Sequence, residues 1–385
     1  MARWNSANKS RYYHLLNKIA DAGHNVLVVQ PPPRSSEETN YIDLPPESHA
    51  NVELYTVAIA SWLWDVRFPL DKFFKKALYT ILSYFTIRRL IKKNKPDILI
   101  VYNLPQYIYT IGNNIPIVFD YADDYIAMLQ HELGLSNDNL FCIISSLLLR
   151  RLINKSVLVT SVSETLNRKV VHQNKLLLSN GADFFPSNDA STTLHIDKKQ
   201  PVLGYVGAFE YFIDLDMMLD AAERLPDYTF LFVGAGREFS RIKDMIFRRK
   251  LHNVILTGAV PHHQAMQFIS EMDICLNLFN KGPVADAASP IKLFEYMSCA
   301  KPVIATRLAE TQRLDAKIKS FYYADNIAEL VAQVEYILRH PELTKENVER
   351  EVQMVKTNFT WFSLADKFIY ELTRTLQERM VWKNG

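Results

Sequence analysis

The sequence has few cysteines and no apolar segment at its start. Its 385 residues include three cysteines, Cys142, Cys275 and Cys299, which are scattered and form no CxxC pair. This usage provides no zinc or disulfide framework and is typical of a reducing compartment. The first twenty residues lack the apolar core of a secretory signal. We therefore expect a cytoplasmic protein.

The chain also lacks a strong charge of either sign. Its 44 lysines and arginines nearly balance its 42 acidic residues, for a net charge of +2. Composition therefore gives no reason to expect nucleic-acid binding. The content of 48% hydrophobic and 22% charged residues is that of a globular protein. At roughly 150 residues per domain, the length suggests two domains.

No apolar run is long enough to span a membrane, but two segments could lie on one. The run LFCIISSLLL, residues 140–149, has about half of the ~20 residues that a spanning helix needs. We interpret it as a buried core helix, with an interfacial helix as the alternative. Residues 62–93 mix aromatic and basic side chains. They form either a solvated helix face or a contact with an anionic membrane.

Residues 1–183 alternate helical and strand patterns. We predict helices over 9–22, 70–94 and 127–153, and short apolar strands in HNVLVVQ, PDILIVYN, IPIVFDY, SVLVTSVS and KLLLSN. Such strands, separated by helices, indicate a parallel sheet covered on both faces. A doubly wound domain normally begins with a strand, whereas this chain begins with a polar loop and a helix. Either the first strand is absent, or the domain starts upstream.

The alternation restarts after a polar segment. We predict a linker over 184–200, a second parallel α/β domain over 201–360, and a closing helix over 361–385 that can cross back to the first domain. The expected fold class is thus two tandem doubly wound α/β domains. This arrangement places the carboxyl ends of both sheets across a cleft, where such folds bind ligands.

Glycines end three of the predicted strands in the second domain. They are Gly207 in GYVGAF, Gly234 and Gly236 in FVGAG, and Gly258 in LTGAV. A residue without a side chain lets the backbone approach a ligand closely. The sequence GAGREF lacks the third glycine of a dinucleotide fingerprint, so an NAD oxidoreductase is not supported.

The segment SPIKLFEYM, beginning at Ser289, has the pattern of a helix N-terminus. The hydroxyl of Ser289 can cap the helix, and Pro290 lacks the N–H that would lose its partner there. Lys292 and Glu295 are three residues apart and share one face near the positive end of the helix dipole. The pattern predicts an anion site, while an amphipathic helix with one surface ion pair remains the alternative.

Six segments together resemble the large group 1 (family 4) of GT-B glycosyltransferases, which includes bacterial polysaccharide and lipid-linked glycan enzymes. They are GYVGAF, FVGAG, NVILTGAVPHHQ, SPIKLFEYMSCAKPVIAT, SNGAD and TNFTWFSLADKF. The resemblance covers residues 156–385 well and the preceding residues thinly. It implies two Rossmann-like domains and a nucleoside diphosphate sugar, UDP-linked by expectation, as the donor substrate.

The resemblance also implies roles for individual residues. The carboxylate of Glu295 would bind the donor ribose, and the helix start, Ser289, Pro290, Ile291 and Lys292, would receive the diphosphate. Gly207, Gly234 and Gly236 would line the same donor site. This arrangement stabilises the leaving diphosphate without a metal ion. We therefore expect neither a metal nor a cofactor.

Two departures from the family pattern stand out. The family's Glu-x7-Glu pair loses its first acid here, because Ala287 occupies that position, with Asp286 beside it. The loop AFEYFIDLD also lacks the arginine and lysine found in many relatives. Lys292, with Lys281 as a further candidate, would therefore carry more of the phosphate charge.

The first domain is expected to bind the acceptor. Asp123 and Asp124 in DYADD follow a predicted strand and face the expected cleft. One of them would act as the base of an inverting enzyme, or would position the acceptor in a retaining one. Helix capping is the alternative for both. The four histidines His14, His131, His262 and His263 lack metal spacing and are interpreted as structural or surface residues.

An apparent DxD metal motif, DLD at 214–216, is better explained as a helix start, whose first turn favours acids. Our hypothesis is a glycosyltransferase that acts on a glycan or lipid-linked acceptor at the cytoplasmic face of a membrane. The hypothesis includes peripheral contact of the protein with anionic lipid. The alternative is a non-catalytic subunit that binds a sugar nucleotide or a partner enzyme. Ala287 favours the alternative, whereas Lys292 and Glu295 oppose it.

Overall fold

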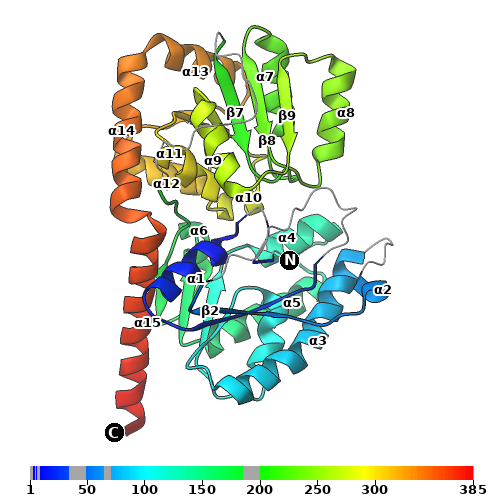
Figure 1. The fold of residues 1–385 in the computed structure, drawn as a ribbon, viewed down its shortest axis with the longest axis vertical. Helices are drawn as coiled ribbons and strands as arrows, with labels where there is room; N and C mark the ends of the chain where they lie inside the picture. The colour runs from blue at the N-terminus through cyan, green and yellow to red at the C-terminus, as the bar shows by residue number, and fades with distance from the viewer. Residues whose placement is uncertain are drawn as a thin grey trace.

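The computed structural model describes residues 3–4, 6, 9–33, 49–64, 71–184 and 200–384. Within these ranges the chain forms two α/β halves, and the last two helices run along one side of both (Figure 1). The first half contains α1 (Arg11–Asp21), β1 (Val26–Gln30), β2 (Val52–Thr56), α2 (Ser61–Trp64), α3 (Asp71–Asn94), β3 (Leu99–Val101), the 3-10 helix η1 (Leu104–Thr110), β4 (Ile117–Tyr121), α4 (Tyr125–Leu133), α5 (Leu140–Lys155), β5 (Leu158–Ser161), α6 (Glu164–Lys169) and β6 (Lys175–Leu177).

The second half follows the same alternation and ends in two long helices. Its elements are β7 (Val202–Val206), α7 (Leu215–Arg224), β8 (Thr229–Val233), α8 (Phe239–Arg249), β9 (Val254–Gly258), α9 (His262–Glu271), β10 (Ile274–Asn277), α10 (Pro283–Ala287), α11 (Ile291–Ser298), β11 (Val303–Ala305), α12 (Ala309–Ile318), β12 (Tyr322–Tyr323), α13 (Ile327–Arg339), α14 (Pro341–Asn358) and α15 (Trp361–Asn384).

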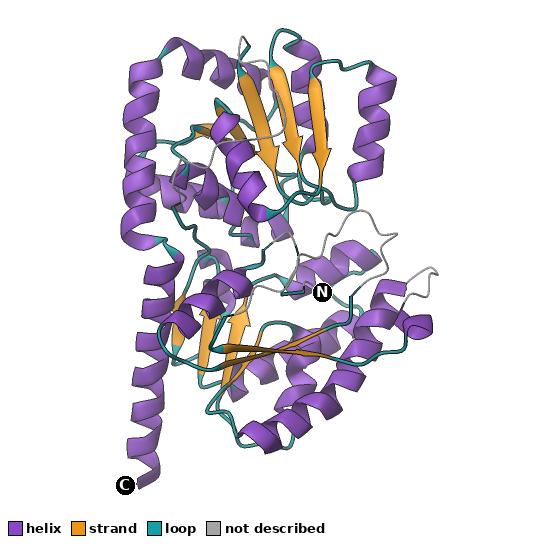
Figure 2. Cartoon of the chain, viewed as in Figure 1, coloured by secondary structure: helices purple, strands orange, loops and turns teal. Residues whose placement is uncertain are grey.

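The second half has one six-stranded parallel sheet in the order β12-β11-β10-β7-β8-β9. The strand order reverses between β7 and β10, which is the switch point where doubly wound sheets bind ligands. The carboxyl ends of β7, β8 and β9 point toward the first half (Figure 2). Apolar side chains pack on both faces of this sheet. The sheet therefore presents its switch point to the space between the halves.

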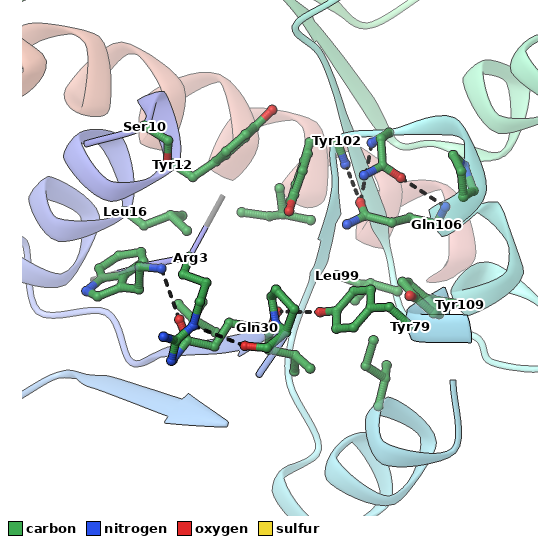
Figure 3. A pocket seen from close by; sticks show the side chains of 18 of the residues that line it. Arg3, Ser10, Tyr12, Leu16, Gln30, Tyr79, Leu99, Tyr102, Gln106 and Tyr109 are labelled. Atoms are coloured by element: carbon green, nitrogen blue, oxygen red, sulfur yellow. Dashed lines mark hydrogen bonds between the residues drawn. The ribbon is translucent and has the colours of Figure 1, made fainter. Parts of the chain in front are cut away.

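The first half is divided into two parallel sheets. One contains β3-β4-β5-β6 and the other contains only β1-β2. A slot separates β1 from β3, and in the described ranges no strand fills it. Leu16 of α1 and Leu99 of β3 are among the apolar side chains that line the slot (Figure 3). The slot is continuous with the space between the halves, in a cavity of about 3350 Å³.

Helix α15 returns to the first half and packs there against α1. Trp361 and Phe368 of α15 share one apolar cluster with Leu15 and Ile19 of α1. The return point lies beside the outgoing chain, because Thr360 forms a parallel bridge with Ala182. The preceding residue has to be glycine, since a Cβ on Gly181 would lie 2.2 Å from the carbonyl oxygen of Phe359. The two crossings between the halves are thus adjacent.

Several elements differ from the sequence-based expectation. The helix predicted over 127–153 is two helices, because Gly134 adopts a left-handed conformation with φ of 62° at the end of α4. Asn139 then caps α5, its side chain accepting a hydrogen bond from the Phe141 amide at 2.9 Å. The short elements β2, α10 and α12 were not predicted. The linker expected over 184–200 lies mainly outside the described residues.

The interpretation of residues 140–149 as a buried core helix is wrong. Leu140 and Phe141 are 68% and 66% exposed, and Ile143, Ile144 and Leu147 are exposed as well. Helix α5 is anchored by Leu152 and Ile153 in the apolar cluster of β4 and β5 and by the buried Cys142 in its first turn, while most other side chains of its first turns are exposed. No helix in the described part of the chain is long and apolar enough to cross a membrane.

Candidate functional site at the carboxyl end of β7

Glycines hold the loops after β7 and β8 in close contact. Gly207 and Gly234 have φ values of 144° and 132°, which favour glycine. A Cβ on Gly234 would lie 2.1 Å from the Gly207 carbonyl oxygen, and one on Gly236 would lie 2.5 Å from the Phe209 amide nitrogen. A side chain on Gly207 would meet Lys292 at 2.9 Å. The glycines therefore allow Lys292 to lie directly against the end of β7.

Lys292 is held at this point by aromatic residues. Its Nζ donates a hydrogen bond to the Tyr205 hydroxyl at 2.7 Å and lies 4.2 Å from the centre of the Tyr205 ring. The Tyr205 hydroxyl in turn donates to the Ala208 carbonyl oxygen at 2.7 Å. Burial lowers the pKa of Lys292 to about 7. A nearby anion would favour the charged form of this amine, so the geometry suits a phosphate ligand.

Glu295, one turn further along α11, accepts a hydrogen bond from His262. The His262 Nε2 and Glu295 Oε1 atoms are 2.7 Å apart, and both side chains are largely buried. Burial alone would raise the pKa of Glu295, but the hydrogen bond and charge of His262 hold it below the usual value. Glu295 is therefore ionised near neutral pH and accepts hydrogen bonds.

A second histidine lies behind this pair. The ring of His14 is 5.2 Å from that of His262 and stacks on Trp361 at 5.0 Å. Burial, followed by the charge of His262, lowers the pKa of His14 to about 3, so His14 is neutral. The interpretation of His262 as only a structural or surface residue is therefore incomplete, because it contacts the acid of the site. His263 is exposed beside it.

The prediction that Ser289 caps the helix is wrong. Its hydroxyl accepts a hydrogen bond from the Asn180 amide at 3.3 Å, and its carbonyl oxygen accepts one from the Asn180 side chain. The helix begins at Ile291 with Pro290 at the N-cap, and no side chain caps it. Ser289 thus binds the segment after β6, residues 178–183, which leads out of the first half and which we call the hinge. The first amides of α11 remain available. The Ile291 side chain packs into the apolar cluster of α1 and α15, away from these amides.

The structure explains why no carboxylate occupies the position of the family's first acid. Ala287 is buried among apolar residues of the first half, including Tyr121 and Leu166. Its carbonyl oxygen accepts a hydrogen bond from Ser163 at 2.7 Å. The carboxylate of Asp286, beside it, accepts a hydrogen bond from the amide of Ala309, at the start of α12.

A buried polar network connects the two halves beneath the site. Arg11 of α1 donates from Nε to Asp120 at 2.9 Å and from Nη1 to the Asn180 side chain at 3.0 Å. Thr160 also donates to Asp120. Because Asn180 binds Ser289, the network runs from α1 through β4 and the hinge to the start of α11. The links from Arg11 to Asp120 and Asn180, and from Asn180 to Ser289, were not expected from the sequence, since these partners are more than 100 residues apart.

The two acids of DYADD have different environments. Asp124 caps α4, accepting from the Ala127 amide at 3.2 Å, and pairs with Lys169 at 2.5 Å. The capping interpretation therefore holds for Asp124. Asp123 is exposed and lines the cavity beside Tyr12. Limited solvation inside the cavity, and then the charge of Asp120, raise the pKa of Asp123.

Aromatic rings surround the exposed acid on the first half. Tyr12 stacks on Tyr102 with ring centres 4.1 Å apart, which bridges α1 and the end of β3 (Figure 3). Tyr125 donates its hydroxyl to the Tyr102 carbonyl oxygen. The hydroxyl of Tyr12 is buried and has no hydrogen-bond partner. This side of the cavity offers flat rings next to a carboxylate, which is a surface that can hold a sugar ring.

Arg237, which the sequence reasoning missed, bridges the open side of the cavity. It follows Gly236 directly and forms ion pairs with Glu132 of α4 at 2.9 Å and with Glu210 at 3.1 Å. Beside it, the rings of Tyr211 and His131 stack at 4.1 Å across the two halves. These contacts join α4 of the first half to the loops after β7 and β8 in the lining of the cavity. The sequence signal that could have identified Arg237 is its position immediately after FVGAG, at the end of a predicted strand.

The DLD sequence behaves as a helix start. Asp214 caps α7, its carboxylate accepting from the Met217 amide at 3.0 Å, and Asp216 pairs with Arg241 at 2.8 Å. Among the described residues, no group of three or more histidine, cysteine or acidic side chains is arranged to hold a metal ion.

Comparison with known proteins agrees with this geometry. Residues 216–369 match the family described as glycosyl transferase-like. The chain is 26% identical over 239 residues to a putative teichuronic acid biosynthesis glycosyltransferase of Bacillus subtilis, covering 58% of this chain and 58% of that relative. The chain thus spans less than two thirds of this curated relative.

Solved structures show the same fold. Sucrose-phosphate synthase from Thermosynechococcus elongatus superposes with a TM-score of 0.74 at 17% identity, covering 95% of this chain and 92% of that one. The Anabaena protein HepE, in complex with UDP, gives a TM-score of 0.56 at 16% identity, with coverages of 84% and 86%. The expected GT-B fold of two Rossmann-like domains is confirmed.

Proposed function

We propose that this GT-B chain, whose residues 216–369 match the glycosyl transferase-like family, transfers a sugar from a nucleoside diphosphate donor to a glycan or lipid-linked acceptor. The observation that carries the proposal is the group formed by Gly207, Lys292 and Glu295 at the end of β7. It lies at the switch point of the sheet, where a ligand of this fold binds.

In this proposal the donor diphosphate lies at the uncapped start of α11, beside Lys292. Backbone amides at a helix N-terminus and an ammonium group both favour phosphate. The Glu295 carboxylate accepts hydrogen bonds from the ribose hydroxyls, with His262 orienting it. These groups neutralise the leaving diphosphate in place of a metal ion. UDP is the proposed nucleotide, supported by its presence in the HepE complex.

The acceptor in this proposal lies against the first half, with its reacting hydroxyl near Asp123. The raised pKa of this exposed acid suits proton transfer if the reaction inverts the sugar. In a retaining reaction the same carboxylate positions the hydroxyl. Tyr12 and Tyr102 supply the flat surface next to it.

A second candidate function is a non-catalytic subunit that binds a sugar nucleotide. It is favoured by Ala287, which is buried in the position of the family's first acid. Hydrolysis or transfer of the sugar from UDP-glucose by the purified protein separates the two candidates. Tight binding of UDP without release of sugar from any UDP-sugar supports the non-catalytic role.

The donor site is tested by thermal unfolding with a panel of nucleoside diphosphates. A ligand at 100 times its Kd stabilises the folded state by about 2.7 kcal/mol. For a domain of this size we expect UDP to raise the Tm by about 5–10 °C. UMP should raise it less, because it lacks the phosphate that lies at α11. Equal Tm values with and without every nucleotide would contradict the proposal.

The Glu295→Ala variant identifies the part of the site that binds the ribose. Loss of hydrogen bonds to a charged group costs about 1.5–3 kcal/mol, so we expect the Kd for UDP in calorimetry to rise about 10–100-fold. Glu351→Gln is the matched control, since Glu351 is a fully buried acid of the same half on α14. The control should keep the Kd of the unmodified protein. Unchanged affinity in Glu295→Ala would remove the ribose assignment.

A further inference from the structure

Helix α5 exposes a large apolar surface. Leu140, Phe141, Ile143, Ile144 and Leu147 are all at least 45% exposed, in the first two turns of a helix whose last turns are anchored. Large apolar side chains gathered on one exposed surface mark a contact site in a soluble protein. Single exposed apolar residues need no such explanation.

Helix α3 carries a similar stripe. Phe74, Ile81 and Phe85 are exposed and follow one another at helical spacing, with Phe85 67% exposed. Helix η1 contacts both α3 and α5. Ile81 of α3 and Phe141 of α5 also line the same cavity. On these two grounds we group the stripes as one surface, which we call the α3/α5 face.

The charge of this face has one sign. Exposed cations follow the apolar side chains in both helices: Arg88, Arg89, Lys92, Lys93, Arg150, Arg151 and Lys155. Helix α3 also carries Lys75 and Lys76 beside Phe74, at its start. Helix α5 contains no acidic residue, and α3 contains none after Asp71. Asp138, just before α5, is the nearest acid in sequence to its exposed turns. An apolar zone followed by a basic zone matches the acyl region and the anionic headgroups of a lipid surface.

We propose that the α3/α5 face binds an anionic lipid bilayer. The apolar turns of both helices enter the interface, and the cations after them contact lipid phosphates. A protein partner would need apolar pockets opposite the apolar side chains and acidic side chains opposite the cations. A bilayer supplies an apolar interior and anionic headgroups without any specific fit. The charge complementarity therefore favours lipid.

Binding of a bilayer to this face also restricts the kind of acceptor, an inference that rests on the proposed function. Phe141 and Ile81 line the cavity that also contains Asp123. A bilayer on the α3/α5 face thus lies next to the opening of the acceptor side. The substrate class that follows is an acceptor anchored in the membrane by a lipid, with its glycan end entering the cavity.

The experiment measures sedimentation of the full chain with vesicles of phosphatidylcholine containing 30% phosphatidylglycerol. We expect binding at low ionic strength that weakens with added salt, because screening reduces the contribution of the cations. Phe141→Ser combined with Leu147→Ser should lower the partition coefficient at least about tenfold. Arg150→Gln combined with Arg151→Gln should lower it by a similar factor, about tenfold, on anionic vesicles only.

Phe247→Ser is the control, since Phe247 is 84% exposed on α8 of the other half. It should bind vesicles as the unmodified protein does. The UDP-induced rise in Tm, measured on every variant, reports folding and the donor site separately from lipid binding. Equal sedimentation of the unmodified protein with neutral and anionic vesicles, or of Phe141→Ser/Leu147→Ser and the unmodified protein, would overturn the proposal. So would a dimer in solution that these two substitutions dissociate, which would make the partner a second copy.

Discussion

Replacing Lys292 by methionine is expected to lower kcat for sugar transfer by about 10²–10³-fold, the range for removing one preorganised charge-stabilising group. Methionine keeps most of the volume of the side chain, so packing beside Gly207 and the Tyr205 ring is retained, whereas the hydrogen bond to the Tyr205 hydroxyl is lost. The ammonium group, which would balance the charge of the leaving diphosphate, is lost. Steady-state kinetics with a UDP-sugar donor measures the effect.

Lys281→Met is the matched control. Lys281 is 55% exposed and pairs with Asp325 at 2.9 Å, away from Tyr205. We expect its kcat to stay within about threefold, since exposed ion pairs contribute at most about 1 kcal/mol. A Lys292→Met enzyme as active as this control would show that the diphosphate is stabilised by other groups.

The lowered pKa of Lys292 gives the same variant a second measurement. The folded protein holds this amine with a pKa of about 7, whereas an unfolded lysine has a pKa of about 10.4. The unfolded chain therefore binds more protons between pH 7 and about 10.4, so this group makes stability rise with pH across that window. The urea midpoint of Lys292→Met should lack this rise. UDP binding near pH 7.5 should also take up a proton in the unmodified protein, and calorimetry in two buffers detects it.

Asp120→Ala is expected to lower the free energy of unfolding by about 3–5 kcal/mol, as for other buried ion pairs that lose one partner. Both Arg11 and Asp120 are 5% exposed at the side chain. Without the carboxylate, the guanidinium of Arg11 keeps only two neutral acceptors, the Ser179 carbonyl and the Asn180 side chain. Urea unfolding followed by tryptophan fluorescence reports the change, because Trp361 of α15 packs in the apolar cluster of the first half.

The control for this change is Asp216→Ala. Asp216 also pairs with an arginine, Arg241, at 2.8 Å, but its side chain is 54% exposed. We expect a loss of at most about 1 kcal/mol. Equal losses in the two variants would mean that burial of the Arg11 and Asp120 pair adds nothing to stability.

The alternation of apolar strands and helices was enough to predict the fold. In the second half, and from β3 to β6 in the first, strands and helices alternate with short connections, and parallel pairing follows from that order. The position of Lys292 and Glu295 was likewise readable, because three residues of spacing set a common helix face. These features depend on residues that are neighbours in sequence.

What the sequence did not reveal depends on partners that are distant in sequence. His262 reaches Glu295 from the start of another helix, 33 residues away. Ser289 was expected to cap α11, yet its hydroxyl accepts a hydrogen bond from the amide of Asn180, 109 residues away in sequence. The exposure of α5 was missed for a different reason: an apolar run does not show how far a helix extends beyond the sheet that it covers.

The slot between β1 and β3 leaves β1 and β2 as a separate two-stranded sheet, which we expect to open more easily than the six-stranded sheet. Strand β1 is hydrogen bonded only to β2 among the described strands, whereas β7 lies between two partners in the six-stranded sheet. Amide hydrogens of β1 and β2 therefore exchange with solvent through openings that cost less free energy than those of β7 and β10. On warming, we expect the sheet of β1 and β2 to lose its packing before the six-stranded sheet of the other half does.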